Sequence, residues 1–185
     1  PEFRMPRKET TPILMIAGGT GIAPFKGFVE RRLHSNNASS QGEAIMVFGC
    51  RTRANELYRD FMTEACDRGA LSQYLVGYSR EADTPKAYVS DVLLANADVV
   101  KRIIDNDGHI YVCGDVRIEA SARDALVAIV GEDTIRALEE SRRYSLDIFG
   151  AWDIQTSHNR RLENTKSISR EKSLSPLRHT KSDIH

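Results

Sequence analysis

The stretch Ile13-Leu-Met-Ile-Ala-Gly-Gly-Thr-Gly-Ile-Ala-Pro-Phe25 joins an apolar run to a glycine-rich turn and the start of a helical pattern. The apolar run does not alternate with polar residues, which is typical of a strand buried on both faces of a parallel sheet. The glycines permit positive φ and close backbone approach, and Pro24 suits the first turn of a helix. Backbone N–H groups and the positive end of a helix dipole then face one point, so the stretch predicts a site for a phosphate-bearing cofactor.

The same residues also fit an ordinary tight turn between a strand and a helix. Their spacing is G-G-T-G and not G-x-G-x-x-G, so the usual dinucleotide fingerprint is absent.

The composition narrows the class of protein. A chain of 185 residues can hold one domain with a sizeable core and an unstructured remainder. Lys plus Arg equals Asp plus Glu at 26 each, so no global charge argues for nucleic acid or membrane partners. Three widely spaced cysteines make neither a disulfide framework nor a zinc pattern, so we expect no metal site and a reducing, cytoplasmic location. No apolar run is long enough for a membrane span. Because the chain opens at Pro1, we expect it to be a piece of a larger protein.

Strand-like and helix-like segments alternate along the chain. Strands are expected from Ile13, over 44–48, 71–78, 109–113 and 144–149, and helices from Pro24, over 54–68, 88–95, 99–104, 118–130 and 133–142. Strict alternation predicts an α/β fold: a five-stranded, parallel, Rossmann-like sheet with helices on both faces.

Composition also divides the chain into three parts. Residues 1–12 are interpreted as a connector from a preceding domain, and residues 13–149 as the cofactor-binding domain. Residues 150–185 are rich in Ser and Thr and carry seven basic against four acidic side chains. Such a segment buries little apolar surface, so we expect a disordered tail.

Candidate binding residues follow the predicted strands, because ligands of open parallel sheets bind beyond the carboxyl ends of the strands. They are Gly19, Thr20 and Gly21, then Arg51, then Ser79, Arg80, Lys86 and Tyr88, then Cys113 and Asp115, and finally Asp147 and Phe149. Basic groups, a hydroxyl and an aromatic ring near a glycine turn suit a dinucleotide with an extra phosphate. Ser79, Arg80 and Lys86 are candidates for a 2′-phosphate. Each of these residues taken alone also fits a solvated loop position.

Five motifs occur here in order and carry a specific resemblance: Gly19-Thr-Gly-Ile-Ala-Pro-Phe25, Phe48-Gly-Cys-Arg51, Tyr78-Ser-Arg-Glu81 with Lys86-Ala-Tyr88, His109-Ile-Tyr-Val-Cys-Gly-Asp115, and Arg143-Tyr-Ser-Leu-Asp-Ile-Phe149. Residues 11–149 thereby resemble the NADPH-binding half of the ferredoxin–NADP reductase superfamily, in its diflavin-reductase branch. The Asp-Ile-Phe-Gly ending, the basic tail and the loop spacing are similar to nitric oxide synthase. Two departures are Gly18, where the family usually has proline, and a short stretch between Asp115 and Tyr144.

The resemblance implies a mechanism. NADPH would pass hydride to FAD on a preceding domain, and electrons would continue through FMN to haem, for the conversion of arginine to citrulline and nitric oxide. Cys113 and Asp147 would flank the reacting nicotinamide carbon, and Phe149 would stack on the flavin. Thr20 and Arg51 would hold the pyrophosphate. Alone, the chain is expected to bind NADPH and reduce nothing.

The resemblance also implies partners: FAD and FMN domains of the same polypeptide, a haem oxygenase domain, calmodulin and a second copy in a homodimer. In nitric oxide synthases the extension that corresponds to residues 150–185 restrains electron flow. Two alternatives stay open: a flavoprotein like cytochrome P450 reductase or sulfite reductase, and a nucleotide-binding module that regulates without chemistry.

Overall fold

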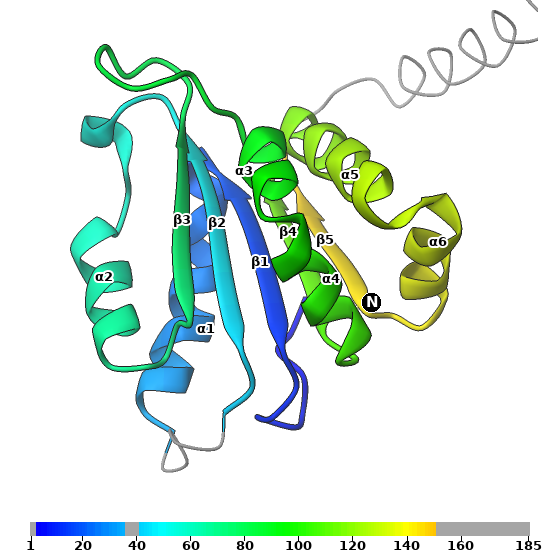
Figure 1. Ribbon diagram of the computed structural model, residues 1–185. Helices are drawn as coiled ribbons and strands as arrows, with labels where there is room; N and C mark the ends of the chain where they lie inside the picture. The colour runs from blue at the N-terminus through cyan, green and yellow to red at the C-terminus, as the bar shows by residue number, and fades with distance from the viewer. Residues whose placement is uncertain (1–2, 36–40, 151–185) are drawn as a thin grey trace, which may run out of the picture. The chain divides into compact units, whose positions relative to one another are not determined.

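The sheet of the computed structural model has five parallel strands in the order β3-β2-β1-β4-β5 (Figure 1). The structure describes residues 3–35 and 41–150. The strands are β1 (Ile13–Gly18), β2 (Ala44–Cys50), β3 (Gln73–Tyr78), β4 (His109–Gly114) and β5 (Tyr144–Ile148). The predicted α/β fold with a five-stranded parallel sheet is confirmed. All six residues of β1 are buried, as expected for the central strand of a sheet covered on both faces.

The strand register brings the carboxyl ends of the strands to one edge. Gly18 lies opposite Gly49, Gly49 opposite Gly77, and Cys113 opposite Asp147. We call this edge the carboxyl edge. It collects the residues that follow every strand, because all five strands run in the same direction.

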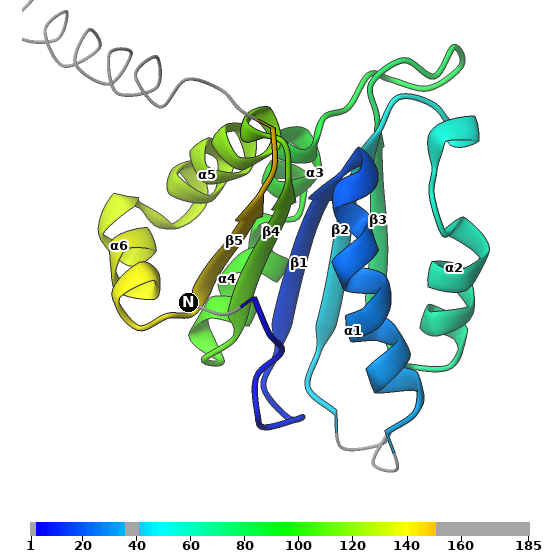
Figure 2. The ribbon, with the colours of Figure 1, turned by 180° about the vertical axis from the view of Figure 1, so that it is seen from behind.

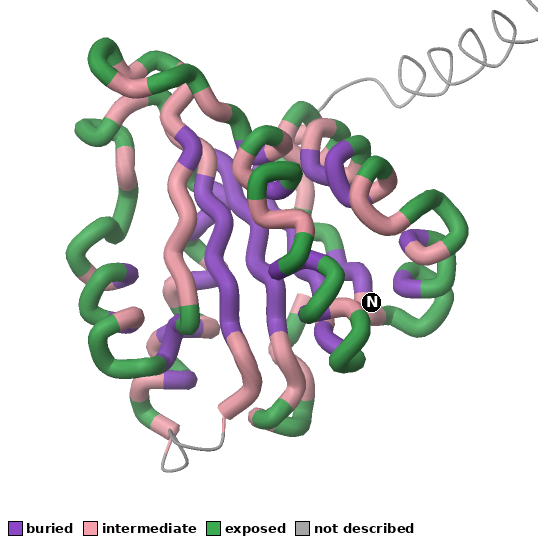
Figure 3. The backbone as a smooth tube through the Cα atoms, viewed as in Figure 1, coloured by how far each residue is buried: buried purple, intermediate pink, exposed green. Residues whose placement is uncertain are grey.

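Helices cover both faces of the sheet, as predicted (Figures 1 and 2). On one face lie α1 (Ala23–Leu33), preceded by the 3₁₀ turn η1 (Gly19–Ile22), and α2 (Arg59–Asp67), preceded by the 3₁₀ turn η3 (Arg53–Asn55). On the other lie α3 (Val89–Ala95), α4 (Ala97–Asp105), α5 (Val116–Val130) and α6 (Glu132–Glu140). The buried residues form two clusters, one on each side of the sheet. Figure 3 shows that the central strand β1 is buried.

Two predicted boundaries are wrong. The helix expected over 54–68 is divided by Tyr58, whose φ of 58° breaks the helical path, and Leu57 is 40% exposed instead of facing the core. The third strand begins at Gln73 and not at Leu71, because the Leu71 N–H bonds to the Ala65 carbonyl at the end of α2.

The segment before β1 packs onto the sheet. The Phe3 ring lies 5.6, 5.7 and 5.4 Å from the rings of Phe25, Phe28 and Tyr111. The buried Tyr111 hydroxyl donates a 2.8 Å hydrogen bond to the Arg4 carbonyl. Residues 3–4 therefore contribute to the core on the α1 side.

The tail predicted over 150–185 lies, from residue 151 onward, outside the described residues. Within 3–35 and 41–150, no helix has the length and apolar character needed to cross a membrane.

Candidate functional site

The glycine turn after β1 lies against β4 on one side and is open to solvent on the other. A Cβ atom on Gly21 would lie 2.2 Å from the carbonyl oxygen of Cys113, so only glycine lets the turn approach β4 this closely. Gly19 has a φ of +55°, and a Cβ atom there would meet nothing within 4 Å. Gly19 and Thr20 are both exposed. The turn thus offers accessible backbone at the carboxyl edge.

Proline, which the resemblance predicts at position 18, does not fit there. Gly18 has a φ of −131°, which proline cannot adopt, and a Cβ atom there would come within 2.3 Å of the Ile118 side chain. The turn itself continues as η1, so α1 begins at Ala23, two residues after Gly21.

The loops after β2 and β3 extend the pairing of these two strands. The Ser79 N–H donates to the Cys50 carbonyl at 3.0 Å, and the Arg80 N–H donates to the Arg51 carbonyl at 2.8 Å. These bonds place Arg51 and Arg80 side by side at the carboxyl edge, and both are exposed. The Ser79 hydroxyl already donates to the Cys50 carbonyl at 3.3 Å, which leaves its oxygen lone pairs for other partners.

The loop that contains Arg80 returns to the sheet at Ala87, whose N–H donates to the Tyr78 carbonyl at 2.9 Å. Lys86 and Tyr88 stand at this return point, with the Lys86 Nζ 4.8 Å from the Tyr88 ring centroid. Tyr88 is 49% exposed. The pair presents a cation and an aromatic face to solvent, a combination that suits a phosphate next to an adenine ring.

Two residues at this edge, Arg53 and Glu56, were not singled out from the sequence. The Arg53 guanidinium lies 5.7 Å from the Tyr78 ring centroid. The Tyr78 hydroxyl donates a 2.6 Å hydrogen bond to Glu56, whose side chain is only 2% exposed. Burial and the bond to Glu56 raise the pKa of Tyr78 to about 12. Glu56 was missed because the sequence predicted a helix from residue 54, and Arg53 because it lies before that helix and after the motif that ends at Arg51.

Cys113 and Asp147 meet at the ends of β4 and β5. The Cys113 thiol is buried and lies 3.8 Å from the Asp147 Oδ2, as a weak donor to the carboxylate. Burial, together with the Asp147 charge, raises the pKa of the Cys113 thiol to about 12. The thiol is therefore neutral at physiological pH and unsuited to act as a nucleophile. Asp147 itself is exposed.

Phe149 lies just beyond β5 and is 44% exposed. Its backbone N–H donates to the Gly114 carbonyl at 3.0 Å, which keeps the chain beside β4. The side chain is therefore partly open to solvent at the end of β5, as a stacking residue requires.

Asp115 serves the fold at the start of α5. Its Oδ1 accepts hydrogen bonds from the N–H groups of Arg117 and Ile118, at 2.9 and 3.2 Å. It also pairs with the Arg117 side chain, and these bonds hold the pKa of Asp115 below its usual value. The carboxylate predicted to bind cofactor is thus engaged as a helix cap.

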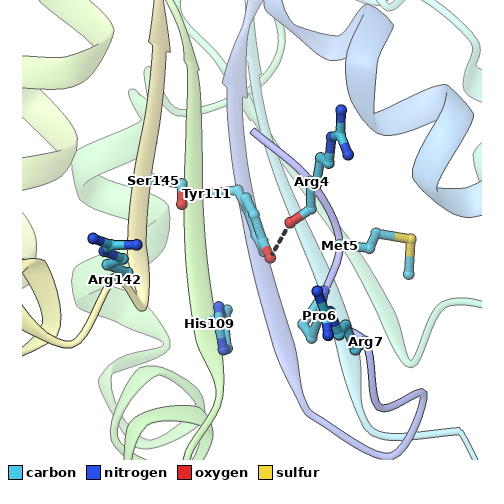
Figure 4. A pocket seen from close by; sticks show the side chains of 8 residues that line it. All are labelled: Arg4, Met5, Pro6, Arg7, His109, Tyr111, Arg142 and Ser145. Carbon is cyan, nitrogen blue, oxygen red and sulfur yellow. Dashed lines mark hydrogen bonds between the residues drawn. The ribbon is translucent and has the colours of Figure 1, made fainter. Parts of the chain in front are cut away.

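A cavity of about 450 Å³ lies away from these residues, between the segment before β1 and the face of β4 and β5 (Figure 4). Its lining residues are Arg4, Met5, Pro6, Arg7, His109, Tyr111, Arg142 and Ser145. None of the residues predicted from the sequence lines this cavity. The predicted site is instead an open surface along the carboxyl edge.

Comparison with known proteins identifies the family of this domain. Residues 15–124 match the family described as oxidoreductase NAD-binding domain. The chain is 38% identical to nitric oxide synthase 3 of Sus scrofa over 165 residues, which is 81% of this chain and 14% of that protein. It is 38% identical to inducible nitric oxide synthase of Rattus norvegicus, over 80% of this chain and 14% of that protein. A nitric oxide synthase-like protein of Bombyx mori is 35% identical over 81% of this chain and 15% of its own length.

The chain thus spans about one seventh of the length of these relatives. Four of the five motifs that carried the resemblance lie within residues 15–124, and the motif over 143–149 lies beyond them. The chain therefore belongs to the oxidoreductase NAD-binding domain family, and its resemblance to nitric oxide synthases, expected from its motifs, is confirmed.

Proposed function

We propose that this chain binds NADPH and presents it for hydride transfer to FAD, as the NADPH-binding part of a diflavin reductase of the nitric oxide synthase type. The observation that carries the proposal is the gathering of three cations, Arg51, Arg80 and Lys86, at the same edge as the open glycine turn. A dinucleotide with a 2′-phosphate carries its negative charges at two separate points, and this edge offers positive groups for both.

The residues fit such a ligand in physical terms. At Gly19 the backbone is open to solvent, so a pyrophosphate can approach without meeting a side chain. Thr20 and Arg51 would hold the pyrophosphate, Ser79, Arg80 and Lys86 the 2′-phosphate, and Tyr88 the adenine ring. Gly21 serves by letting the turn lie against β4.

At the other end of the site, NADPH supplies a hydride from its nicotinamide ring. Asp147 would stabilise the positive charge that grows on this ring as hydride leaves, because its carboxylate is already in place before the reaction. The neutral Cys113 thiol would pack against the ring and orient the carboxylate. Phe149 would cover the flavin and move aside when the nicotinamide docks.

The remaining parts of the system are proposed from the same resemblance. FAD and FMN would be held by preceding domains of the same polypeptide, with a haem oxygenase domain, calmodulin and a homodimer in the complete cytoplasmic protein. Residues 150–185 would act as a brake on electron flow. Removing them from the complete reductase would then raise cytochrome c reduction before any activator is added; equal rates at low salt would contradict the brake.

Calorimetric titration of the full chain with NADPH and NADH tests the proposal. The chain should prefer NADPH, and Arg80→Ala should weaken NADPH binding about tenfold, the lower end of the range for a charge-assisted hydrogen bond, because Arg80 is exposed. NADH affinity should stay unchanged. Arg31→Ala, an exposed arginine on the last turn of α1, is the matched control. Equal loss for both cofactors would show that Arg80 does not meet the 2′-phosphate.

A further inference from the structure

We propose that Arg53 is a further ligand for the 2′-phosphate and that Glu56 positions it through the Tyr78 ring. The inference rests on the proposed function, since it assigns a specificity residue to the same nucleotide site. It starts from the loop after β2, which continues to residue 58 in the structure, whereas the sequence predicted a helix from residue 54.

The first step is the position of the Arg53 backbone. Its N–H donates a 2.6 Å hydrogen bond to the Glu81 Oε2, across from the loop that follows β3. Two residues earlier in the loop after β2, the Arg51 carbonyl accepts a hydrogen bond from the Arg80 N–H. The two loops are therefore tied together at successive points, and Arg53 stands across from Arg80 with little freedom to move away.

The second step is the position of the Arg53 guanidinium. It lies over the Tyr78 ring, and Tyr78 directly precedes Ser79, a candidate phosphate ligand. Within the part of the chain that the structure describes, Arg53 forms no ion pair, whereas Arg59 nearby pairs with Glu56. The guanidinium also hydrogen-bonds the Tyr78 side chain. Arginine has five N–H donors, so others remain to meet an anion.

The third step is the support under the ring. The Glu56 side chain is buried and accepts the 2.6 Å hydrogen bond from the Tyr78 hydroxyl. A buried carboxylate that bonds one hydroxyl fixes the tilt of the ring, and the ring in turn fixes the guanidinium above it. A cation whose orientation is set beforehand loses less entropy when it binds phosphate.

The charge balance of these loops favours the same assignment. The carboxylate of Glu81 is occupied by the Arg53 N–H and adds negative charge that would oppose a phosphate beside Arg80. The positive charge of Arg53, whose backbone N–H holds Glu81, offsets this negative charge. If Arg53 served only to stabilise Tyr78, its removal would leave the affinity for phosphate unchanged. The test therefore compares ligands with and without a 2′-phosphate.

The test compares 2′,5′-ADP with 5′-AMP as ligands of the full chain in calorimetric titrations at roughly 20 and 300 mM salt. Arg53→Ala should weaken 2′,5′-ADP about fivefold at low salt, the range for an exposed ionic contact, and leave 5′-AMP within about twofold. The loss should shrink at high salt. Arg53→Lys keeps the charge and should recover most of the affinity, and Arg31→Ala removes the same charge elsewhere and should change neither ligand.

Glu56→Gln and Glu56→Ala test the positioning role, because both remove the same charge and only Gln still accepts the Tyr78 hydrogen bond. The Ala variant should bind 2′,5′-ADP more weakly than the Gln variant, with 5′-AMP equal in both; equal affinities would overturn the role of Glu56. If wild type does not prefer 2′,5′-ADP over 5′-AMP, the proposed function itself fails. If wild type prefers it and Arg53→Ala matches wild type, only the inference about Arg53 is wrong.

Discussion

Arg32→Met should destabilise the domain strongly, although Arg32 carries no function in the site. Arg32 is 4% exposed on α1. Its Nε donates to the Ala70 carbonyl at 2.7 Å and its Nη2 to the Gly42 carbonyl at 2.6 Å. The side chain thus joins α1 to the turn after α2 and to the loop before β2, so its loss affects three segments at once.

The expected change in the free energy of unfolding is the difference between lost hydrogen bonds and a desolvation cost that is no longer incurred. Two hydrogen bonds from a charged donor contribute about 1.5–3 kcal/mol each, and without them two carbonyl groups lose their partner. Against this, burial lowers the pKa of Arg32, opposed by the Glu9 charge, which shows that keeping a guanidinium there has a desolvation cost. Methionine fills part of the space and avoids that cost. We expect a net loss of about 2–4 kcal/mol and a fall in Tm of roughly 6–12 °C.

Urea unfolding followed by far-UV circular dichroism, with calorimetry for Tm, measures this loss. Arg31→Met is the matched control, because Arg31 is exposed on the same helix and should change stability by less than ~0.5 kcal/mol. The m-value should stay constant in both variants. A loss below about 1 kcal/mol, or equal losses in the two variants, would refute the reasoning from buried hydrogen bonds.

Three further outcomes are expected. Gly21→Ala should destabilise the domain by about 1–3 kcal/mol and weaken the binding of NADPH and NADH alike, because its Cβ would meet the Cys113 backbone. Unfolding curves measure the stability and titrations the affinities. Wild-type values would mean that the turn can shift away from β4. Cys113→Ala should reduce the loss of stability that occurs as the pH rises. Folding favours the neutral thiol, whose pKa is raised. Wild type therefore loses up to ~2 kcal/mol between about pH 9 and 10.5, as the thiol of the unfolded chain ionises. Parallel pH curves would contradict this assignment. In a complete reductase, Asp147→Asn should slow flavin reduction at saturating NADPH more than it weakens NADP binding, measured by stopped flow; an unchanged rate would make Asp147 structural.

The sheet could be predicted because each element is encoded locally. The buried run from Ile13, the glycine turn and the regular return of apolar segments specify alternating strands and helices without knowledge of contacts. Parallel strands then bring Arg51, Arg80 and Asp147 to one edge, whatever the details of packing.

The loop after β2 shows where this reasoning stops. The sequence predicted one helix over 54–68, but Leu57 is exposed and Tyr58 takes a left-handed φ. A helical period cannot report such a break, because one residue with positive φ changes the direction of the chain and leaves the pattern intact.

By itself, the sequence determined the α/β fold and the family, and it predicted the edge at which a nucleotide would bind, since these depend on local patterns and on motifs in order. Only the tertiary structure decided how individual polar groups are used. It assigned Asp115 to the cap of α5, placed the Cys113 thiol beside Asp147, and set Arg53 over the Tyr78 ring, whose hydroxyl bonds Glu56. The reason is physical: a hydrogen bond between residues distant in sequence depends on distances of a few tenths of an ångström, which packing sets and residue order does not.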